Sequence, residues 1–187
     1  LNQITEQQDS IIVHCWRGGM RSYNMAWLFD LVGKKVFIIQ GGYKSYRSLI
    51  QESLYNLPLK LLVLGGRTGS AKTEILRKMK LQGVQVLDLE ELADHKGSAF
   101  GWIHREKEVG TEAFENQLFE NLIQFNLEKT IWVENESRRI GIAQIPEGIW
   151  QQMRNSPLIH LDIGMEFRLD HLVATYFDDN IDDLILS

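Results

Sequence analysis

Cysteine is nearly missing from this chain of 187 residues, which contains only Cys15. A single thiol excludes an internal disulfide framework and suits a reducing compartment, in which a reactive thiol survives. His95 and His104 have no further His or Cys at the spacing of metal ligands. We therefore expect no metal site of the zinc type.

Long apolar runs are missing as well. No stretch approaches the roughly 20 apolar residues that a membrane-spanning helix needs, and no basic, apolar and small-residue leader opens the sequence. We expect a cytoplasmic protein without a membrane partner. The hydrophobic share of 44% is normal for a globular protein, and the length admits one large or two small domains.

Acidic residues are scarce in the first part of the chain. Residues 1–80 hold 12 Lys or Arg against 5 Asp or Glu, whereas residues 81–187 hold 8 against 20. The first part is therefore the electrostatic candidate for a phosphate-rich partner.

The surroundings of Cys15 are typical of a catalytic loop. The thiol follows the apolar run 11–13 and is followed closely by Arg17, Gly18, Gly19 and Arg21. A strand that turns through glycines into a helix directs backbone N–H groups and the helix dipole at the sulfur. With two arginines nearby, we expect a thiol pKa below about 8.5 and a loop that binds a tetrahedral anion. The alternative is an inert cysteine buried at a strand end.

Two families share the pattern of residues 14–22. It matches the His-Cys-x-x-Gly-x-x-Arg-Ser signature of cysteine phosphatases, and it also resembles the active loop of rhodanese-like sulfurtransferases. A predicted helix over 22–32, a strand over 35–40 and the Gly-Gly turn at 41–42 favour the second family. A tyrosine phosphatase also needs a general-acid Asp well upstream, and Asp9 is too close to Cys15 for that role.

A second glycine-rich loop lies between a predicted buried strand at 59–64 and a predicted helix at 74–81. It follows the pattern Gly, four residues, Gly, Lys, Ser/Thr, in which backbone N–H groups wrap phosphates, Lys neutralises them and the hydroxyl binds Mg²⁺. Ala71 replaces the second Gly, and we expect its Cβ to weaken nucleotide binding. An ordinary βα turn is the alternative. The candidate phosphate-binding residues here are Gly66, Thr68, Gly69, Ser70, Lys72 and Thr73.

Short apolar segments alternate with helical ones in the rest of the chain. This alternation predicts a parallel sheet with helices on both faces and ligands at the carboxyl ends of the strands. Asp88, Glu134 and Glu136 fall at such ends, where one of them could reach Mg²⁺ through water or merely cap a helix. The predicted strands are 84–87, 130–133 and 158–162, and the predicted helices are 111–129 and 165–177.

Two further strings are rich in polar and basic residues. The first, 94–101, contains His95, Gly97, Ser98 and Phe100. The second, 136–141, contains Arg138 and Arg139, which are natural ligands for a diphosphate or an RNA backbone but also common in surface ion pairs.

Five strings together resemble the tRNA 2-selenouridine synthase family, in its order and spacing. They are residues 15–22, 41–44, 66–73, 89–101 and 133–141, so the resemblance runs over nearly the whole chain. It implies an α/β fold in which the C-terminal half of a rhodanese-like domain, 1–55, precedes a P-loop NTPase-like parallel-sheet domain, 58–187. We expect the other half of the first domain to precede this sequence, and the second domain to continue beyond it.

The resemblance also implies an activity, namely modification of the wobble uridine in tRNAs for lysine, glutamate and glutamine. Geranyl diphosphate first alkylates the sulfur of 2-thiouridine, and selenophosphate then replaces the S-geranyl group to leave 2-selenouridine. Cys15 is implied as the selenium-transfer residue, through a selenosulfide-type intermediate, with Arg17 and Arg21 holding the phosphate. The implied co-substrates are selenophosphate and geranyl diphosphate, with no tightly bound cofactor and Mg²⁺ as an additional candidate.

From this we hypothesise that the 66–73 loop serves geranyl diphosphate rather than ATP. Lys72 and Thr73 would then lie at its phosphates, and the substrate-binding candidates are His95, Gly97, Ser98, Phe100, Glu134, Glu136, Arg138 and Arg139. Three alternatives remain at this point: a cysteine-dependent phosphatase or sulfurtransferase, a P-loop kinase or NTPase, and a tRNA-binding scaffold without catalysis.

Overall fold

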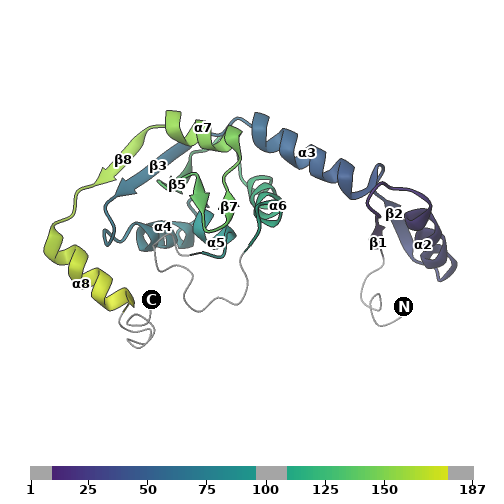
Figure 1. Ribbon diagram of the computed structural model, residues 1–187, viewed down its shortest axis with the longest axis horizontal. Helices are drawn as coiled ribbons and strands as arrows, with labels where there is room; N and C mark the ends of the chain where they lie inside the picture. Colours follow the sequence, from purple (N-terminus) through teal and green to yellow (C-terminus); the bar gives the residue numbers. More distant parts are fainter. Residues whose placement is uncertain (1–9, 96–108, 177–187) are drawn as a thin grey trace. The chain divides into compact units, whose positions relative to one another are not determined.

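A computed structural model describes residues 10–95 and 109–176 (Figure 1). Its contacts divide the chain into two units, Leu1–Ser53 and Leu54–Ser187, with the division inside helix α3 (Gly42–Asn56). Among the described residues, no helix combines the length and the apolar character that crossing a membrane requires.

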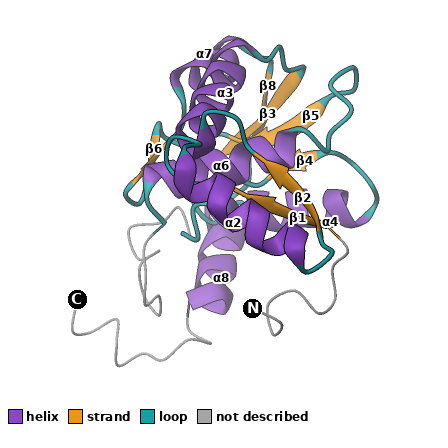
Figure 2. Cartoon of the chain, turned by 90° about the vertical axis from the view of Figure 1, so that its right-hand side faces the viewer, coloured by secondary structure: helices purple, strands orange, loops and turns teal. Residues whose placement is uncertain are grey.

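The first unit contains a pair of parallel strands, β1 (Ser10–Val13) and β2 (Lys35–Ile38). Parallel neighbours need a crossover connection, which helix α2 (Met20–Leu31) supplies. Figure 2 shows α2 lying along the two strands, which it contacts. Because side chains alternate along a strand, one face of the pair is partly covered while Ile12 and Phe37 on the other face stay exposed.

The first turn of α3 packs directly on the loop that contains Cys15. The backbone N–H of Tyr43 donates to the carbonyl of Cys15 at 2.9 Å, and the N–H of Lys44 donates to the carbonyl of Trp16 at 3.0 Å. Gly42 has φ +67°, and a Cβ there would lie 2.1 Å from the Cys15 carbonyl oxygen. Only glycine permits this approach, which explains the Gly-Gly turn in the sequence.

The second unit is built on a four-stranded sheet in the order β4-β5-β3-β8, with every neighbouring pair parallel. Leu64 of β3 lies opposite Glu134 of β5, so the ends of these two strands are adjacent. The strands are β3 (Leu61–Gly66), β4 (Val86–Leu87), β5 (Ile131–Glu134) and β8 (Leu158–Leu161). Around them are α4 (Lys72–Leu81), α5 (Leu89–Leu92), α6 (Thr111–Leu122), α7 (Glu147–Asn155), α8 (Met165–Tyr176) and the antiparallel hairpin of β6 (Arg139–Ile140) and β7 (Ala143–Gln144).

Strands β3, β4 and β5 are buried on both faces, whereas β8 at the edge of the sheet is mostly exposed. On one face, Leu64 and Val86 pack with Leu76 of α4 in a core cluster. On the other face, Ile131 and Val133 are fully buried, and α7 contacts β3 on the side of the sheet away from α4 (Figure 1). Strands covered on both faces read as continuous apolar runs, which is why the sequence revealed them. The predicted parallel α/β arrangement is confirmed, while the rhodanese-like and NTPase-like assignments stay predictions.

Several elements differ from the sequence-based expectation. The helix predicted over 111–129 ends at Leu122, because the chain then turns and Asn126 exchanges hydrogen bonds with the side chain of Gln85. The hairpin of β6 and β7 and the helix α7 were not predicted. The helix predicted to begin at residue 74 begins at Lys72, and the strand predicted over 59–64 is shifted to Leu61–Gly66.

Close packing at Gly148 in α7 yields a stability prediction. A Cβ at this position would lie 2.4 Å from the carbonyl oxygen of Tyr55, which belongs to the backbone and cannot move aside. Gly148→Ala should therefore lower the free energy of unfolding by about 1 to 3 kcal/mol, despite the better helix propensity of Ala. Urea unfolding measures the change, with Gly164→Ala as the control because its Cβ would meet open space. Equal stability of the two variants would contradict this packing.

Candidate functional site

The Cys15 loop surrounds the sulfur with hydrogen-bond donors. The backbone N–H of Gly19, at the N-terminus of α2, donates to Sγ at 3.1 Å. The hydroxyl of Ser22 lies 3.5 Å from Sγ and 2.8 Å from the carbonyl oxygen of Gly19, to which it donates. A hydroxyl carries a single proton, so ionisation of the thiol draws that proton toward the sulfur.

These donors lower the pKa of Cys15 to about 6. The hydrogen bond from the Ser22 side chain contributes most, partial desolvation of the sulfur acts in the opposite direction, and backbone N–H groups of Gly19, Arg17 and Ser22 add to the lowering. The predicted depression of the pKa is confirmed, but its cause differs from our expectation. Arg17 contributes through its backbone, and the guanidinium groups of Arg17 and Arg21 lie on exposed residues. Hydrogen bonds, rather than arginine charge, therefore stabilise the thiolate.

In the second unit, the two candidate side chains at the end of the 66–73 loop contact the same carboxylate. Lys72 Nζ lies 3.4 Å from Glu134 Oε1, and the Thr73 hydroxyl donates to Glu134 Oε2 at 3.0 Å. The side chains of Lys72 and Glu134 are only 13% and 11% exposed. The loop thus holds its cation and its hydroxyl at the N-terminus of α4, where backbone N–H groups favour an anion.

Ala71 adopts the backbone that glycine would adopt. It caps the N-terminus of α4 with φ 59° and ψ 26°, the left-handed conformation, which costs an L-residue about 1 kcal/mol. The Cβ of Ala71 therefore strains the backbone, as expected, but the loop still makes the left-handed turn before α4.

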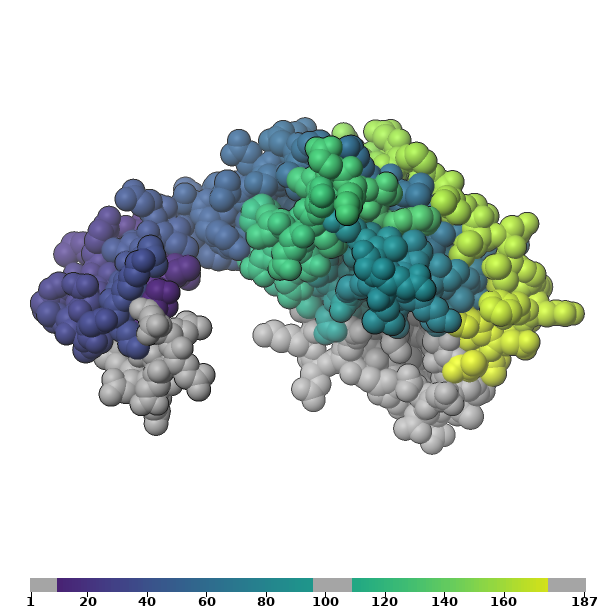
Figure 3. Space-filling model, turned by 180° about the vertical axis from the view of Figure 1, so that it is seen from behind, coloured from purple at the N-terminus to yellow at the C-terminus, as the bar shows by residue number. Residues whose placement is uncertain are grey.

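Helix α8 contacts this loop from a distant part of the sequence and lies at the surface of its unit, in yellow in Figure 3. Arg168 Nε donates to the carbonyl of Thr68 at 2.8 Å, and His171 Nε2 lies 3.0 Å from Glu74 Oε2. A Cβ on Gly69 would lie 2.5 Å from the Arg168 carbonyl oxygen, so this glycine permits the approach of α8. Nothing in the sequence links residue 168 to residue 68.

Acidic side chains gather beside Lys72, as the strand ends predicted. The pKa of Glu136 is raised to about 7, first by burial and then by the neighbouring carboxylates of Glu90, Glu134 and Asp88, against the opposing charge of Lys72. The structure thus brings the three predicted strand-end acids together and adds Glu90, which sequence reasoning missed. In the described part of the chain, no three His, Cys, Asp or Glu side chains form a group able to hold a metal ion.

The remaining candidates lie in different places. His95 packs against Gly141, where a Cβ would lie 2.8 Å from the His95 ring. Arg138 pairs with Glu147 of α7, and Arg139 Nε donates to the Gly141 carbonyl at 2.9 Å. Neither of these arginine contacts reaches the 66–73 loop. Gly97, Ser98 and Phe100 lie outside the described residues.

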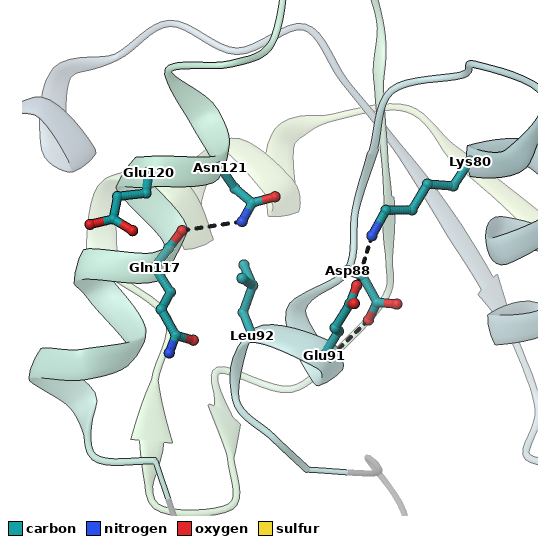
Figure 4. Close-up of a pocket in the computed structure, with 7 residues that line it drawn as sticks. All are labelled: Lys80, Asp88, Glu91, Leu92, Gln117, Glu120 and Asn121. Atoms are coloured by element: carbon teal, nitrogen blue, oxygen red, sulfur yellow. Dashed lines mark hydrogen bonds and ion pairs between the residues drawn. The ribbon is translucent and has the colours of Figure 1, made fainter. Parts of the chain in front are cut away.

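Sequence reasoning also missed a polar pocket of about 320 Å³ between α4, α5 and α6 (Figure 4). Lys80 and Glu91 form an ion pair of 2.7 Å at its rim, and Asp88 accepts the N–H of Glu91 at the start of α5. Asp88 therefore belongs both to this pocket and to the acidic group beside Lys72. The lining residues are Lys80, Asp88, Glu91, Leu92, Gln117, Glu120 and Asn121.

The sequence is similar to a known protein family and to several curated proteins. Residues 59–186 match the family described as tRNA 2-selenouridine synthase AAA domain. The chain is 36% identical to a tRNA 2-selenouridine synthase of Nitrosomonas europaea over 91% of its own length and 45% of the relative, and 33% identical to that of Shewanella frigidimarina over 99% and 50%. It thus spans about half the length of these curated relatives.

A solved structure, AMPPCP-bound DnaA from Aquifex aeolicus, aligns with 77% of this chain and 53% of its own. The TM-score is 0.31 and the sequence identity 16%. A likeness this low carries no argument about fold or function.

The pKa of Cys15 depends on Ser22, so Ser22→Ala should raise it from about 6 toward the ordinary value of 9. The rate of alkylation by iodoacetamide follows the thiolate fraction and should then rise at higher pH than in the wild type. Ser48→Ala, which alters a hydroxyl bonded to the Lys44 carbonyl, is the matched control and should leave the profile unchanged. An unshifted profile in Ser22→Ala would exclude the hydroxyl as the main cause.

The raised pKa of Glu136 predicts that ionisation of this side chain lowers the free energy of unfolding at high pH. The folded chain binds this proton up to about pH 7 and the unfolded chain only to about 4.5, so stability from this group falls as pH rises between those values. Glu136→Gln should therefore raise the free energy of unfolding at pH 8 by about 1 to 3 kcal/mol, and by little near pH 4.5. Urea titrations at both pH values check this, and the exposed, Lys60-paired Glu128 provides the control variant Glu128→Gln, for which no gain is expected.

Proposed function

Because the chain belongs to the tRNA 2-selenouridine synthase family, we propose that it takes part in converting wobble 2-thiouridine of tRNA to 2-selenouridine. The proposed tRNAs are those for lysine, glutamate and glutamine. The reaction proceeds through S-geranyl-2-thiouridine, with geranyl diphosphate and selenophosphate as co-substrates. The observation that carries the proposal is a thiol of pKa about 6 in a loop of backbone donors, on a chain that also has the 66–73 loop.

The Cys15 loop belongs to the selenium step. A thiol of pKa about 6 is mainly thiolate at neutral pH, and the thiolate is the reactive nucleophile. The Gly19 N–H that faces the sulfur can also donate to a bound oxyanion, and the exposed guanidinium groups of Arg17 and Arg21 add charge for selenophosphate. Cys15 is the proposed selenium-transfer residue: its thiolate displaces geranyl thiol at the ring carbon, and the selenium of selenophosphate then displaces the thiolate. Water cleaves the selenium–phosphorus bond, and Arg17 and Arg21 hold the phosphate that is released.

The 66–73 loop belongs to the geranyl step. Lys72, Thr73 and the N-terminus of α4 lie together and suit the two phosphates of geranyl diphosphate. The sulfur of 2-thiouridine attacks the carbon bonded to the diphosphate, the carbon–oxygen bond breaks, and diphosphate leaves with the electron pair. The base releases its N3 proton to water. Because Glu134 already contacts both side chains, the incoming diphosphate must share or displace this carboxylate.

The order of the two steps follows from leaving-group chemistry. A thiocarbonyl sulfur is a poor leaving group, whereas an alkylated sulfur departs as a neutral thiol after taking up a proton. Geranylation thus prepares the ring carbon for substitution by selenium. A single chain that carries a diphosphate loop and a thiolate loop has a site for each step.

Two single substitutions should separate the steps. Cys15→Ser should abolish 2-selenouridine and let S-geranyl-2-thiouridine accumulate, because it removes only the thiolate. Lys72→Ala should lose a charge-assisted phosphate contact, so geranyl diphosphate should bind about tenfold to a hundredfold more weakly and geranylation should fall. Mass spectrometry of tRNA nucleosides, using the full-length protein, measures both products, and each variant serves as the control for the other.

Calorimetry with geranyl diphosphate and ATP tests the competing assignment of the loop. Wild-type protein should bind geranyl diphosphate more tightly than ATP, and Lys72→Ala should retain a reactive Cys15. Tight binding of ATP without binding of geranyl diphosphate would favour a kinase or NTPase. Normal 2-selenouridine in Cys15→Ser would remove Cys15 from the mechanism.

A further inference from the structure

Aromatic rings gather beside Cys15 in the first unit. The ring of Tyr43 is stacked on that of His14 at 6.0 Å, and it lies 5.7 Å from the ring of Trp16. The ring of Tyr46 follows at 6.0 Å from Tyr43. His14 and Trp16 flank Cys15 in sequence, and the backbone N–H of Tyr43 donates to the Cys15 carbonyl, so these three rings and the thiol belong to one local structure. None of these rings has a role in the chemistry described above.

Trp16 presents much of its ring to solvent. It is 53% exposed, whereas Tyr43 and Tyr46 beside it are partly buried. Its carbonyl accepts the N–H of Lys44, which fixes the backbone of the residue. A large ring held at the surface by a fixed backbone can bind a flat partner with little ordering cost.

The charge around this ring suits a polyanion. Residues 10–53 contain six Lys or Arg and two Asp or Glu. Arg17 and Arg21, on the loop and the first turn of α2, are exposed. Single-stranded nucleic acid is recognised by this combination, because cations contact the phosphates and exposed aromatic rings stack on the bases.

We propose that Trp16, supported by Tyr43 and His14, is a stacking platform for an unpaired base of single-stranded RNA beside the Cys15 thiolate. The identity of that RNA as tRNA rests on the proposed function. Trp16 follows Cys15 directly, and consecutive Cα atoms are 3.8 Å apart. A base stacked on Trp16 is therefore held one residue away from the thiol, and such proximity is what a group transfer to that base requires.

The test compares the binding of two RNA hairpins to the full chain by fluorescence anisotropy. One hairpin carries 2-thiouridine in its single-stranded loop, and the other has an abasic site at that position. Trp16→Ala should weaken binding of the first hairpin about tenfold and leave the second nearly unchanged, since only the first offers the base. Trp16→Phe should restore part of the loss. Trp27→Ala is the matched control, because Trp27 is 62% exposed on α2 and should change neither affinity.

Several results would overturn the platform. Unchanged affinity of Trp16→Ala for the 2-thiouridine hairpin would show that Trp16 does not stack on this base, and would favour a protein partner for the exposed ring. An equal loss with both hairpins, or an equal loss in Trp27→Ala, would indicate a general structural effect. A changed pH profile of Cys15 alkylation in Trp16→Ala would likewise indicate that the substitution disturbs the structure of the loop. The binding measurement needs neither geranyl diphosphate nor selenophosphate, so failure of the two-step chemistry would not alter its outcome.

Discussion

The parallel register of β3 and β5 is the constraint on which the site of the second unit depends. It sets Leu64 opposite Glu134, and so delivers a carboxylate to the loop that leaves β3. Lys72 and Thr73 both contact that carboxylate, although 61 residues separate Thr73 from Glu134. Because Lys72 and Glu134 are nearly buried, removing either one would leave an uncompensated charge in a poorly solvated place. A shift of one residue in this register would turn Glu134 to the opposite face of the sheet.

The two loops use different physics to stabilise charge. Around Cys15, neutral donors such as the Ser22 hydroxyl and the Gly19 N–H lie at hydrogen-bonding distance from the sulfur. Around Lys72, full charges of both signs are packed together, and Glu136 retains its proton to about pH 7 because acidic neighbours and burial disfavour a further negative charge. The first loop keeps its anion available for reaction, whereas the second keeps its cation and anion paired.

Local sequence patterns predicted much of this architecture. The buried strands β3 and β5 are continuous apolar runs, and the glycine-rich loops after strands mark both candidate sites. Features that rest on contacts between distant residues were not predictable in this way. The end of α6 depends on Gln85 and Asn126, 41 residues apart, and the approach of α8 depends on Arg168 and Thr68, 100 residues apart. The acidic group beside Lys72 was foreseen because strand ends in a parallel sheet share one edge, but Glu90 lies on a helix that no periodicity marked.

Ala71 shows that a left-handed turn can form without the glycine that normally marks it in the sequence. The loop before α4 retains the left-handed turn, yet the letter Gly is absent from that place in the sequence. A search that demands Gly directly before Lys and Thr would reject this chain, while a search on dihedral angles would find the same turn. Surveys of glycine-rich loops between a strand and a helix that rely on the residue pattern alone will therefore undercount those in which an alanine adopts the left-handed turn.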